Sequence, residues 1–69
     1  MTMLRSQHGS PYDRGGADSY YQRPFDPHYW PNGTGNGIRV EKSEMTEKEI
    51  IEYTLGFDDN EDAGNFKVY

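Results

Sequence analysis

Carboxylates are the residues of this sequence whose type and spacing most clearly indicate a function. Nine of the twelve acidic residues lie between Glu41 and Asp62, and the chain carries a formal net charge of −5. Summed surface charge steers a partner, so this segment should repel nucleic acid and attract a basic protein surface. Two interpretations stay open: a solvated helix face, or a surface that imitates the phosphate spacing of a nucleic acid. The predicted partner-binding carboxylates are Glu47, Glu49, Glu52, Asp58, Asp59, Glu61 and Asp62.

Aromatic and arginine side chains gather before this acidic segment. The set comprises Tyr20, Tyr21, Phe25, Tyr29 and Trp30, with Arg14 and Arg23 nearby in the sequence. Three interpretations stay open: a thin core, a protein interface, where Tyr, Trp and Arg are enriched, or a stacking platform for single-stranded nucleic acid. We predict that Tyr29 and Trp30 are apolar anchors for a partner, and we include Arg14 and Arg23 in the partner site.

Patterns typical of catalysis or metal binding are incomplete in this sequence. His28 lacks companion nitrogen or thiolate ligands, so it is interpreted as a loop histidine. Asp58-x-Asn60-x-Asp62 resembles the start of a calcium loop, but Ala63 stands where glycine is required. Gly33-x-Gly35-x-Gly37 has no lysine after it and indicates turns instead of a phosphate loop. We predict a non-enzymatic protein with no metal and no cofactor.

Length and composition predict one small domain with a thin core. The 69 residues include no cysteine, and Leu, Ile, Val and Phe together number ten. A chain this short buries only about 60% of its unfolded surface, so it has marginal stability. We expect a partner or a homo-oligomer to supply its final rigidity. No apolar run is long enough for a membrane span or a signal peptide, which predicts a cytoplasmic protein without a membrane partner.

The first predicted helix spans about residues 11–22. Ser10 can cap it, Pro11 suits the first helical position, and Asp13 complements the helix dipole. Pro24 disfavours helical geometry in the residue before it and should end the element. Residues 1–9 are expected to be a flexible polar tail, so that the domain covers residues 10–69.

The second predicted helix spans about residues 46–60. Thr46 and Glu49 have the spacing of a capping box, and Met45 with Ile50 has that of a hydrophobic staple. The helix either stops at Gly56 or runs through it to Gly64. The acidic residues after Phe57 oppose the helix dipole, so fraying is expected after about Asn60.

The segment between the helices is rich in proline and glycine. Asn32-Gly33 and Asn36-Gly37 are turn signals, so residues 28–30 either pair with 38–40 in a short hairpin or belong to a structured loop. The C-terminal residues Phe66, Val68 and Tyr69 are expected to fold back as an extended arm. The predicted fold class is small and mainly α, with two helices joined by this loop or hairpin.

A short repeat links the two predicted helices. Tyr12-x-x-Gly15-x-x-Asp18 and Tyr53-x-x-Gly56-x-x-Asp59 have the same pattern and spacing. Residues without Cβ let two backbones approach, so the repeat predicts a close helix crossing at the glycines, covered by the tyrosines. The alternative is a chance match of three positions.

The sequence resembles the small ribosome-modulation-factor-like proteins. The residues that carry this resemblance are Asp13-Arg14-Gly15, Arg23-Pro24, Pro27-His28-Tyr29 and Tyr53-x-x-Gly56-Phe57. The segment from Tyr12-Asp13-Arg14-Gly15 through Pro27, with the Tyr53-x-x-Gly56-Phe57 helix, is also similar to small proteins carried by phages and prophages. The resemblance covers about residues 10–60 and implies a two-helix fold. The ribosome-binding members of the family are basic, whereas this chain is acidic.

The leading function hypothesis is an acidic, phage-encoded binding protein of the host cytoplasm. It would inhibit or modulate a host nucleic-acid-binding machine by protein contact, as anti-CRISPR and other anti-defence proteins do. The alternative, implied by the resemblance and by Arg14 and Arg23, is a translation modulator that associates with the ribosome.

Overall fold

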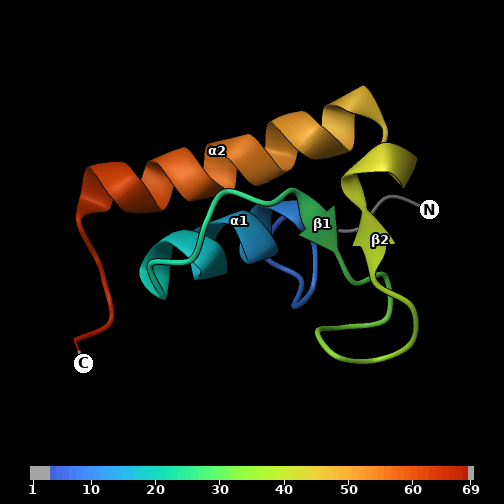
Figure 1. Cartoon of the computed structure of the whole chain (residues 1–69), viewed down its shortest axis with the longest axis horizontal. Coiled ribbons are helices and arrows are strands. Elements are labelled where there is room, and N and C mark those ends of the chain that lie inside the picture. The colour runs from blue at the N-terminus through green and yellow to red at the C-terminus, as the bar shows by residue number, and fades with distance from the viewer. Residues whose placement is uncertain (1–3, 69) are drawn as a thin grey trace.

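The computed structural model describes residues 4–68. The first three residues of the predicted tail, and Tyr69 of the predicted C-terminal arm, lie outside the described residues. The elements in chain order are α1 (Pro11–Tyr20), β1 (His28–Tyr29), β2 (Val40–Glu41), a short 3-10 helix (Lys42–Glu44) and α2 (Glu47–Ala63). Figure 1 shows α2 lying along α1, with the two strands below the first turns of α2. The two predicted helices are therefore present, together with a two-stranded sheet.

Helix α1 begins as its capping signals predict and ends earlier than expected. The Ser10 side chain accepts a hydrogen bond from the Asp13 N–H at 3.2 Å. The helix stops at Tyr20 because Gln22 adopts a left-handed φ of 57°, and the Arg23 N–H returns to the Asp18 carbonyl at 2.7 Å. The predicted end at residue 22 was wrong, because this turn ends the helix before Pro24 can act.

Helix α2 begins with the predicted capping box. The Thr46 hydroxyl accepts from the Glu49 N–H at 3.2 Å, and the Glu49 carboxylate accepts from the Thr46 N–H at 2.8 Å. Both of these N–H groups would otherwise lack a partner in the first turn. The local sequence signal for the start of this helix is thus confirmed.

Replacing Thr46 with alanine should destabilise the protein by about 1 kcal/mol, since it removes the acceptor for the Glu49 N–H. The measurement is thermal unfolding followed by far-UV circular dichroism. Thr46→Ser keeps a hydroxyl at the cap and is the matched control. Equal melting of Thr46→Ala and the native protein would show that the cap contributes nothing.

Helix α2 continues through the acidic residues where fraying was expected. Asp59 accepts a hydrogen bond from the Tyr12 hydroxyl, and Glu61 accepts one from the Ser19 hydroxyl. Asn60 also donates to the Ser19 hydroxyl oxygen at 2.9 Å. The expected fraying after about Asn60 was wrong, and the alternative of a helix that runs to Gly64 is confirmed, because α1 supplies partners that outweigh the unfavourable helix dipole. Gly64, with a left-handed φ of 65°, then caps the helix.

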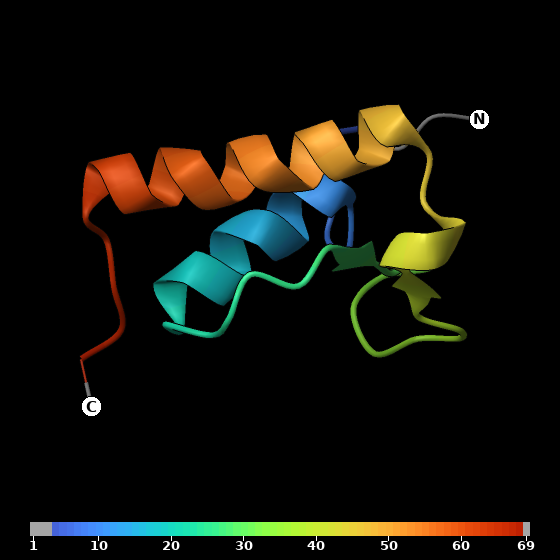
Figure 2. The same ribbon diagram turned by 45° about the horizontal axis from the view of Figure 1, so that its top comes forward.

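The two helices cross at the glycines of the repeat. A Cβ added to Gly15 would lie 2.0 Å from the Tyr53 carbonyl oxygen, and one added to Gly56 would lie 2.1 Å from the Tyr12 carbonyl oxygen. Each glycine therefore faces the backbone of the other helix at its tyrosine. The predicted close crossing is confirmed, and Figure 2 shows α1 directly beneath α2.

The linker between the helices must return along the molecule, because α1 and α2 run in the same direction (Figures 1 and 2). On this return β1 and β2 pair antiparallel, with His28 opposite Glu41 and Tyr29 opposite Val40. The predicted hairpin is present in a shorter form, shifted by one residue on the second strand. Ten residues connect the strands, so this is an open hairpin with a long loop.

The described parts of both terminal segments touch the helices. Arg5 forms an ion pair with Glu52 at 2.7 Å, and the Gly9 carbonyl accepts from the Trp30 N–H at 2.7 Å. At the other end the Lys67 N–H donates to the Tyr20 carbonyl at 2.8 Å. Residues 4–9 of the expected tail thus follow the body of the protein, and the arm folds back onto the end of α1.

The core is small and unusually polar. Met45 and Tyr53 are the only buried large hydrophobic side chains among residues 4–68. The Phe25 ring packs edge-on against the Tyr53 and Phe57 rings, with centroids 5.3 Å apart in each pair. The buried polar side chains are Ser10, Arg14, Asp18, Ser19 and His28. Neither described helix is long and apolar enough to cross a membrane.

Candidate functional site

The tyrosine and aspartate residues of the repeat bond each other across the helix crossing. The Tyr53 hydroxyl donates to Asp18, and the Tyr12 hydroxyl donates to Asp59. The first pair is buried and the second is exposed. Sequence reasoning found the glycines but did not assign a role to the aspartates. Their fixed spacing within the repeat was the signal that could have found them.

Four of the seven predicted partner-binding carboxylates form hydrogen bonds or ion pairs within the fold. Glu49 completes the cap of α2, Glu52 pairs with Arg5, Asp59 accepts from Tyr12, and Glu61 accepts from Ser19. The hydrogen bond and charge of Arg5 lower the pKa of the Glu52 carboxyl. Glu52, Asp59 and Glu61 thus tie α2 to the rest of the chain, and Glu49 bonds within the cap of its own helix, so none of the four is without a partner.

The other three predicted carboxylates lie on the outer side of α2. Those of Glu47, Asp58 and Asp62 form no hydrogen bond or ion pair with another described residue, and all three residues are exposed. Ile51 and Leu55, exposed by 51% and 40%, lie between them on the helix. The spacing of three to four residues places all five on one side of α2. We call the set Glu47, Ile51, Leu55, Asp58 and Asp62 the outer stripe.

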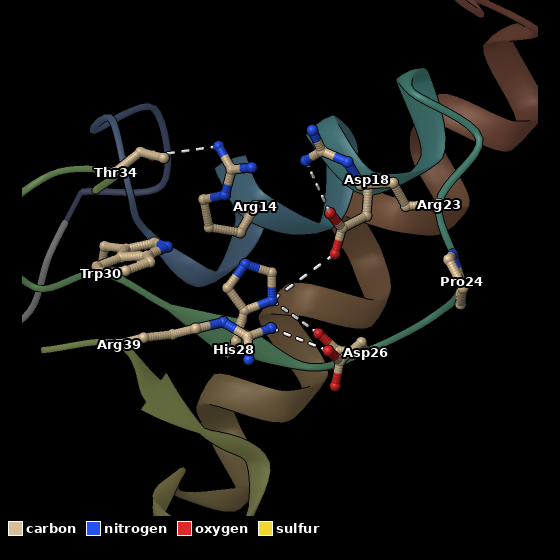
Figure 3. A pocket seen from close by; sticks show the side chains of 9 residues that line it. All are labelled: Arg14, Asp18, Arg23, Pro24, Asp26, His28, Trp30, Thr34 and Arg39. Atoms are coloured by element: carbon tan, nitrogen blue, oxygen red, sulfur yellow. Dashed lines mark hydrogen bonds and ion pairs between the residues drawn. The ribbon is translucent and has the colours of Figure 1, made fainter.

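A second feature is a pocket of about 400 Å³ formed outside α2. Its lining consists of Arg14, Asp18, Arg23, Pro24, Asp26, His28, Trp30, Thr34 and Arg39. We call it the arginine pocket, since three of the four arginines of the chain line it. Figure 3 shows the Arg14 and Arg23 guanidinium groups along one edge, Arg39 across from them, and Trp30 at one end.

Several elements bring these side chains together. Arg14 and Asp18 lie one turn apart on α1, and Arg23 follows the turn that ends the helix. Arg39 precedes β2, so strand pairing places it close to the residues around β1. The Thr34 N–H donates to His8 at 3.3 Å, which fixes the loop beside α1. The sequence predicted Arg14, Arg23 and Trp30 as site residues and missed Arg39 and Thr34.

The charges of the arginine pocket are unequally compensated. Arg23 lies 3.6 Å from an Asp18 carboxylate oxygen, and Arg39 lies 2.9 Å from an Asp26 carboxylate oxygen. Arg39 also bonds Glu41, which lies outside the pocket. The side chain of Arg14 is 9% exposed, and its ion pair with Asp13 is long, at 3.8 Å. Its one side-chain hydrogen bond runs from Nη1 to the Thr34 hydroxyl oxygen at 3.1 Å.

His28 lies buried beside the same carboxylates. Its Nδ1 lies 2.7 Å from the Asp26 carbonyl oxygen and 3.7 Å from Asp18 Oδ2. A carbonyl oxygen can only accept, so Nδ1 carries the proton. The interpretation as a loop histidine was incomplete, because His28 lies in strand β1 and its ring packs against the Tyr53 ring, with 5.7 Å between the centroids. The part of the chain described here contains no cluster of three or more His, Cys, Asp or Glu residues that could hold a metal ion.

The two predicted aromatic anchors face different hollows. Trp30 lines the arginine pocket, whereas Tyr29 lines a pocket of about 590 Å³ together with Glu49 and Arg5. Burial and a hydrogen bond with Glu49 raise the pKa of the Tyr29 hydroxyl to about 12. Trp30 directly follows Tyr29, the last residue of β1, and successive side chains along a strand point to opposite sides, which explains the separation. The two rings therefore do not form one anchor.

Comparison with known proteins identifies no relative of this chain. No family model, no curated protein and no solved structure matches the chain. The family resemblance stays a prediction. Function must therefore be argued from the outer stripe and the arginine pocket.

Proposed function

We propose that this protein is a non-enzymatic binding protein that contacts a basic surface of a partner protein through the outer stripe of α2. The observation that carries the proposal is the exposure of Ile51 and Leu55 between carboxylates that no described residue engages. Burying such side chains against a partner is favourable, at about 25 cal/mol per Å² of apolar surface. The flanking carboxylates would steer a basic partner and set its orientation.

The proposed partner is a nucleic-acid-binding machine of the host, because its nucleic-acid groove supplies the basic surface. The protein would act as an inhibitor or modulator of that machine, as phage-encoded anti-defence proteins do. The net charge of −5 supports this partner class. We restrict the proposed contact surface to the outer stripe, because Glu49, Glu52, Asp59 and Glu61 already form hydrogen bonds or ion pairs within the fold.

Affinity capture from host lysate, followed by mass spectrometry, tests the proposal. Basic nucleic-acid-binding proteins should be recovered at low salt and lost as salt screens the carboxylates. Once a partner is identified, the double variant Ile51→Ala, Leu55→Ala should bind it about tenfold or more weakly. Its matched control is Ile38→Ala, Val68→Ala, which truncates two exposed aliphatic side chains outside α2.

A second variant tests the charge of the outer stripe. Glu47→Gln, Asp58→Asn, Asp62→Asn should slow association and remove most of its salt dependence. Glu44→Gln, an exposed carboxylate outside the stripe, is the control. Equal binding by the Ile51→Ala, Leu55→Ala variant and by its control Ile38→Ala, Val68→Ala would contradict the proposal. Recovery of ribosomes would favour the translation modulator instead.

A further inference from the structure

Arg14 is the buried cation of the arginine pocket with the fewest partners. Its Nε has no hydrogen-bond partner among the described residues, and only Nη1 donates to another side chain. A buried charge is costly unless counter-charges and hydrogen bonds surround it. Arg23 and Arg39 differ from Arg14, since both are partly exposed and each faces a carboxylate of the pocket lining. The pocket thus holds a buried guanidinium whose Nε lacks an acceptor among the described residues.

The groups around Arg14 select the kind of anion that would fit. A planar guanidinium pairs best with a carboxylate or a phosphate oxyanion. Asp18 and Asp26 already line the pocket, and Asp13 and Glu41 lie close to its arginines. These carboxylates would repel a multiply charged phosphate, and the net charge of −5 would repel a nucleic acid strand. A singly charged carboxylate meets the least repulsion.

The rest of the pocket suits a carbon chain attached to that carboxylate. Trp30 and Pro24 supply apolar surface beside the arginines. The volume of about 400 Å³ lies within the range of small-ligand sites. Figure 3 shows the Trp30 ring at the end of the pocket near Thr34, the residue that holds the Arg14 guanidinium.

We propose that the arginine pocket binds a peptide carboxylate, seated on Arg14 and Arg23, with its carbon chain against Trp30. The carboxylate comes from a peptide C-terminus or from an acidic side chain. No lining residue belongs to α2, so this site is separate from the outer stripe. Ligand binding here can therefore be confirmed or refuted independently of the proposed partner contact.

The fluorescence of Trp30 tests the ligand class, since this is the only tryptophan of the chain. The probes are acetyl-Ala-Ala with a free carboxylate, the same dipeptide as its amide, acetyl-Ala-Glu-Ala-amide, acetate, inorganic phosphate and a short oligothymidylate. We expect a saturable change with one or both carboxylate peptides and none with the dipeptide amide. The peptide that binds identifies the source of the carboxylate. Tighter binding of phosphate, oligothymidylate or acetate, or no saturable change, would overturn the proposal.

Two variants and one resonance test the position of the ligand. Arg14→Gln should weaken peptide binding by about tenfold or more, because it removes the guanidinium. Arg23→Gln changes a partly exposed residue and should weaken binding about threefold, as a rim charge does. Arg5→Gln removes the same charge outside the pocket and should bind normally. In the native protein, the Arg14 Nε–H resonance should shift as peptide is added. An unchanged Arg14 Nε–H resonance, or normal peptide binding by both Arg14→Gln and Arg23→Gln, would contradict the proposed position of the carboxylate.

Discussion

Replacing Gly15 with alanine should destabilise the protein by about 1–3 kcal/mol, as overpacking does. The new Cβ would lie 2.0 Å from the Tyr53 carbonyl oxygen and 2.9 Å from the Phe57 nitrogen. Both of these atoms belong to the backbone of α2, so no side-chain rotation can relieve the contact. The helices would have to separate at the crossing. Gly56→Ala should behave similarly, because its Cβ would meet the Tyr12 carbonyl.

Gly16→Ala is the matched control for this prediction. A Cβ at Gly16 would lie 3.6 Å from the Gly56 carbonyl oxygen, which is an ordinary contact. Alanine has the better helix propensity, so this variant should gain up to roughly 1 kcal/mol. Urea unfolding followed by circular dichroism compares the three variants. If Gly15→Ala were as stable as Gly16→Ala, the close crossing would be refuted. Gly56 lies inside α2, so a role as a helix terminus does not complicate the result.

Tyr53→Phe should destabilise the protein by about 1–3 kcal/mol, although it keeps the ring. The Tyr53 hydroxyl donates to the buried Asp18 carboxylate and accepts from the Asp26 N–H at 3.2 Å. Removing the hydroxyl leaves both groups without this partner. Tyr12→Phe removes the equivalent hydroxyl from the exposed pair with Asp59, and water can replace it there. Urea unfolding should therefore show a much smaller loss for Tyr12→Phe. Equal losses of unfolding free energy in Tyr53→Phe and Tyr12→Phe would contradict the burial of the Tyr53–Asp18 pair.

The same hydroxyl gives the unfolding free energy a pH dependence. Burial, and then the hydrogen bond with Asp18, raise the pKa of the Tyr53 hydroxyl above its usual value. A raised pKa in the folded state stabilises the protein fully below the unfolded pKa of about 10, and this contribution is lost as the pH rises further. Native protein should therefore lose stability above about pH 10, and Tyr53→Phe should lack that part of the loss.

Local sequence signals determined where the helices begin and how they meet. The cap at Thr46 depends on residues three positions apart, so adjacent sequence specifies it. The repeat predicted the crossing, because only glycine permits two backbones to approach so closely. Gly15 and Gly56 each face the opposite helix as that pattern requires.

Contacts between distant residues determined where the helices end and which charged side chains lack a partner within the fold. The dipole of an isolated helix disfavours the carboxylates near the end of α2, yet Tyr12 and Ser19 of α1 bond Asp59 and Glu61. Together with the cap at Glu49 and the ion pair of Glu52, these contacts engage four of the seven predicted carboxylates. A sequence shows that a carboxylate is present, but only the packed structure shows whether another side chain already forms a hydrogen bond or an ion pair with it.

The sequence by itself determined an acidic chain with a capped second helix and a glycine-mediated helix crossing. Only the tertiary structure decided which charges are exposed and which arginines share a pocket. Arg14, Arg23 and Arg39 come from a helix, a turn and the residue before a strand, and the return path of the linker brings them together. Such a pocket depends on the three-dimensional course of the chain, because no spacing rule connects residues positioned by three separate elements.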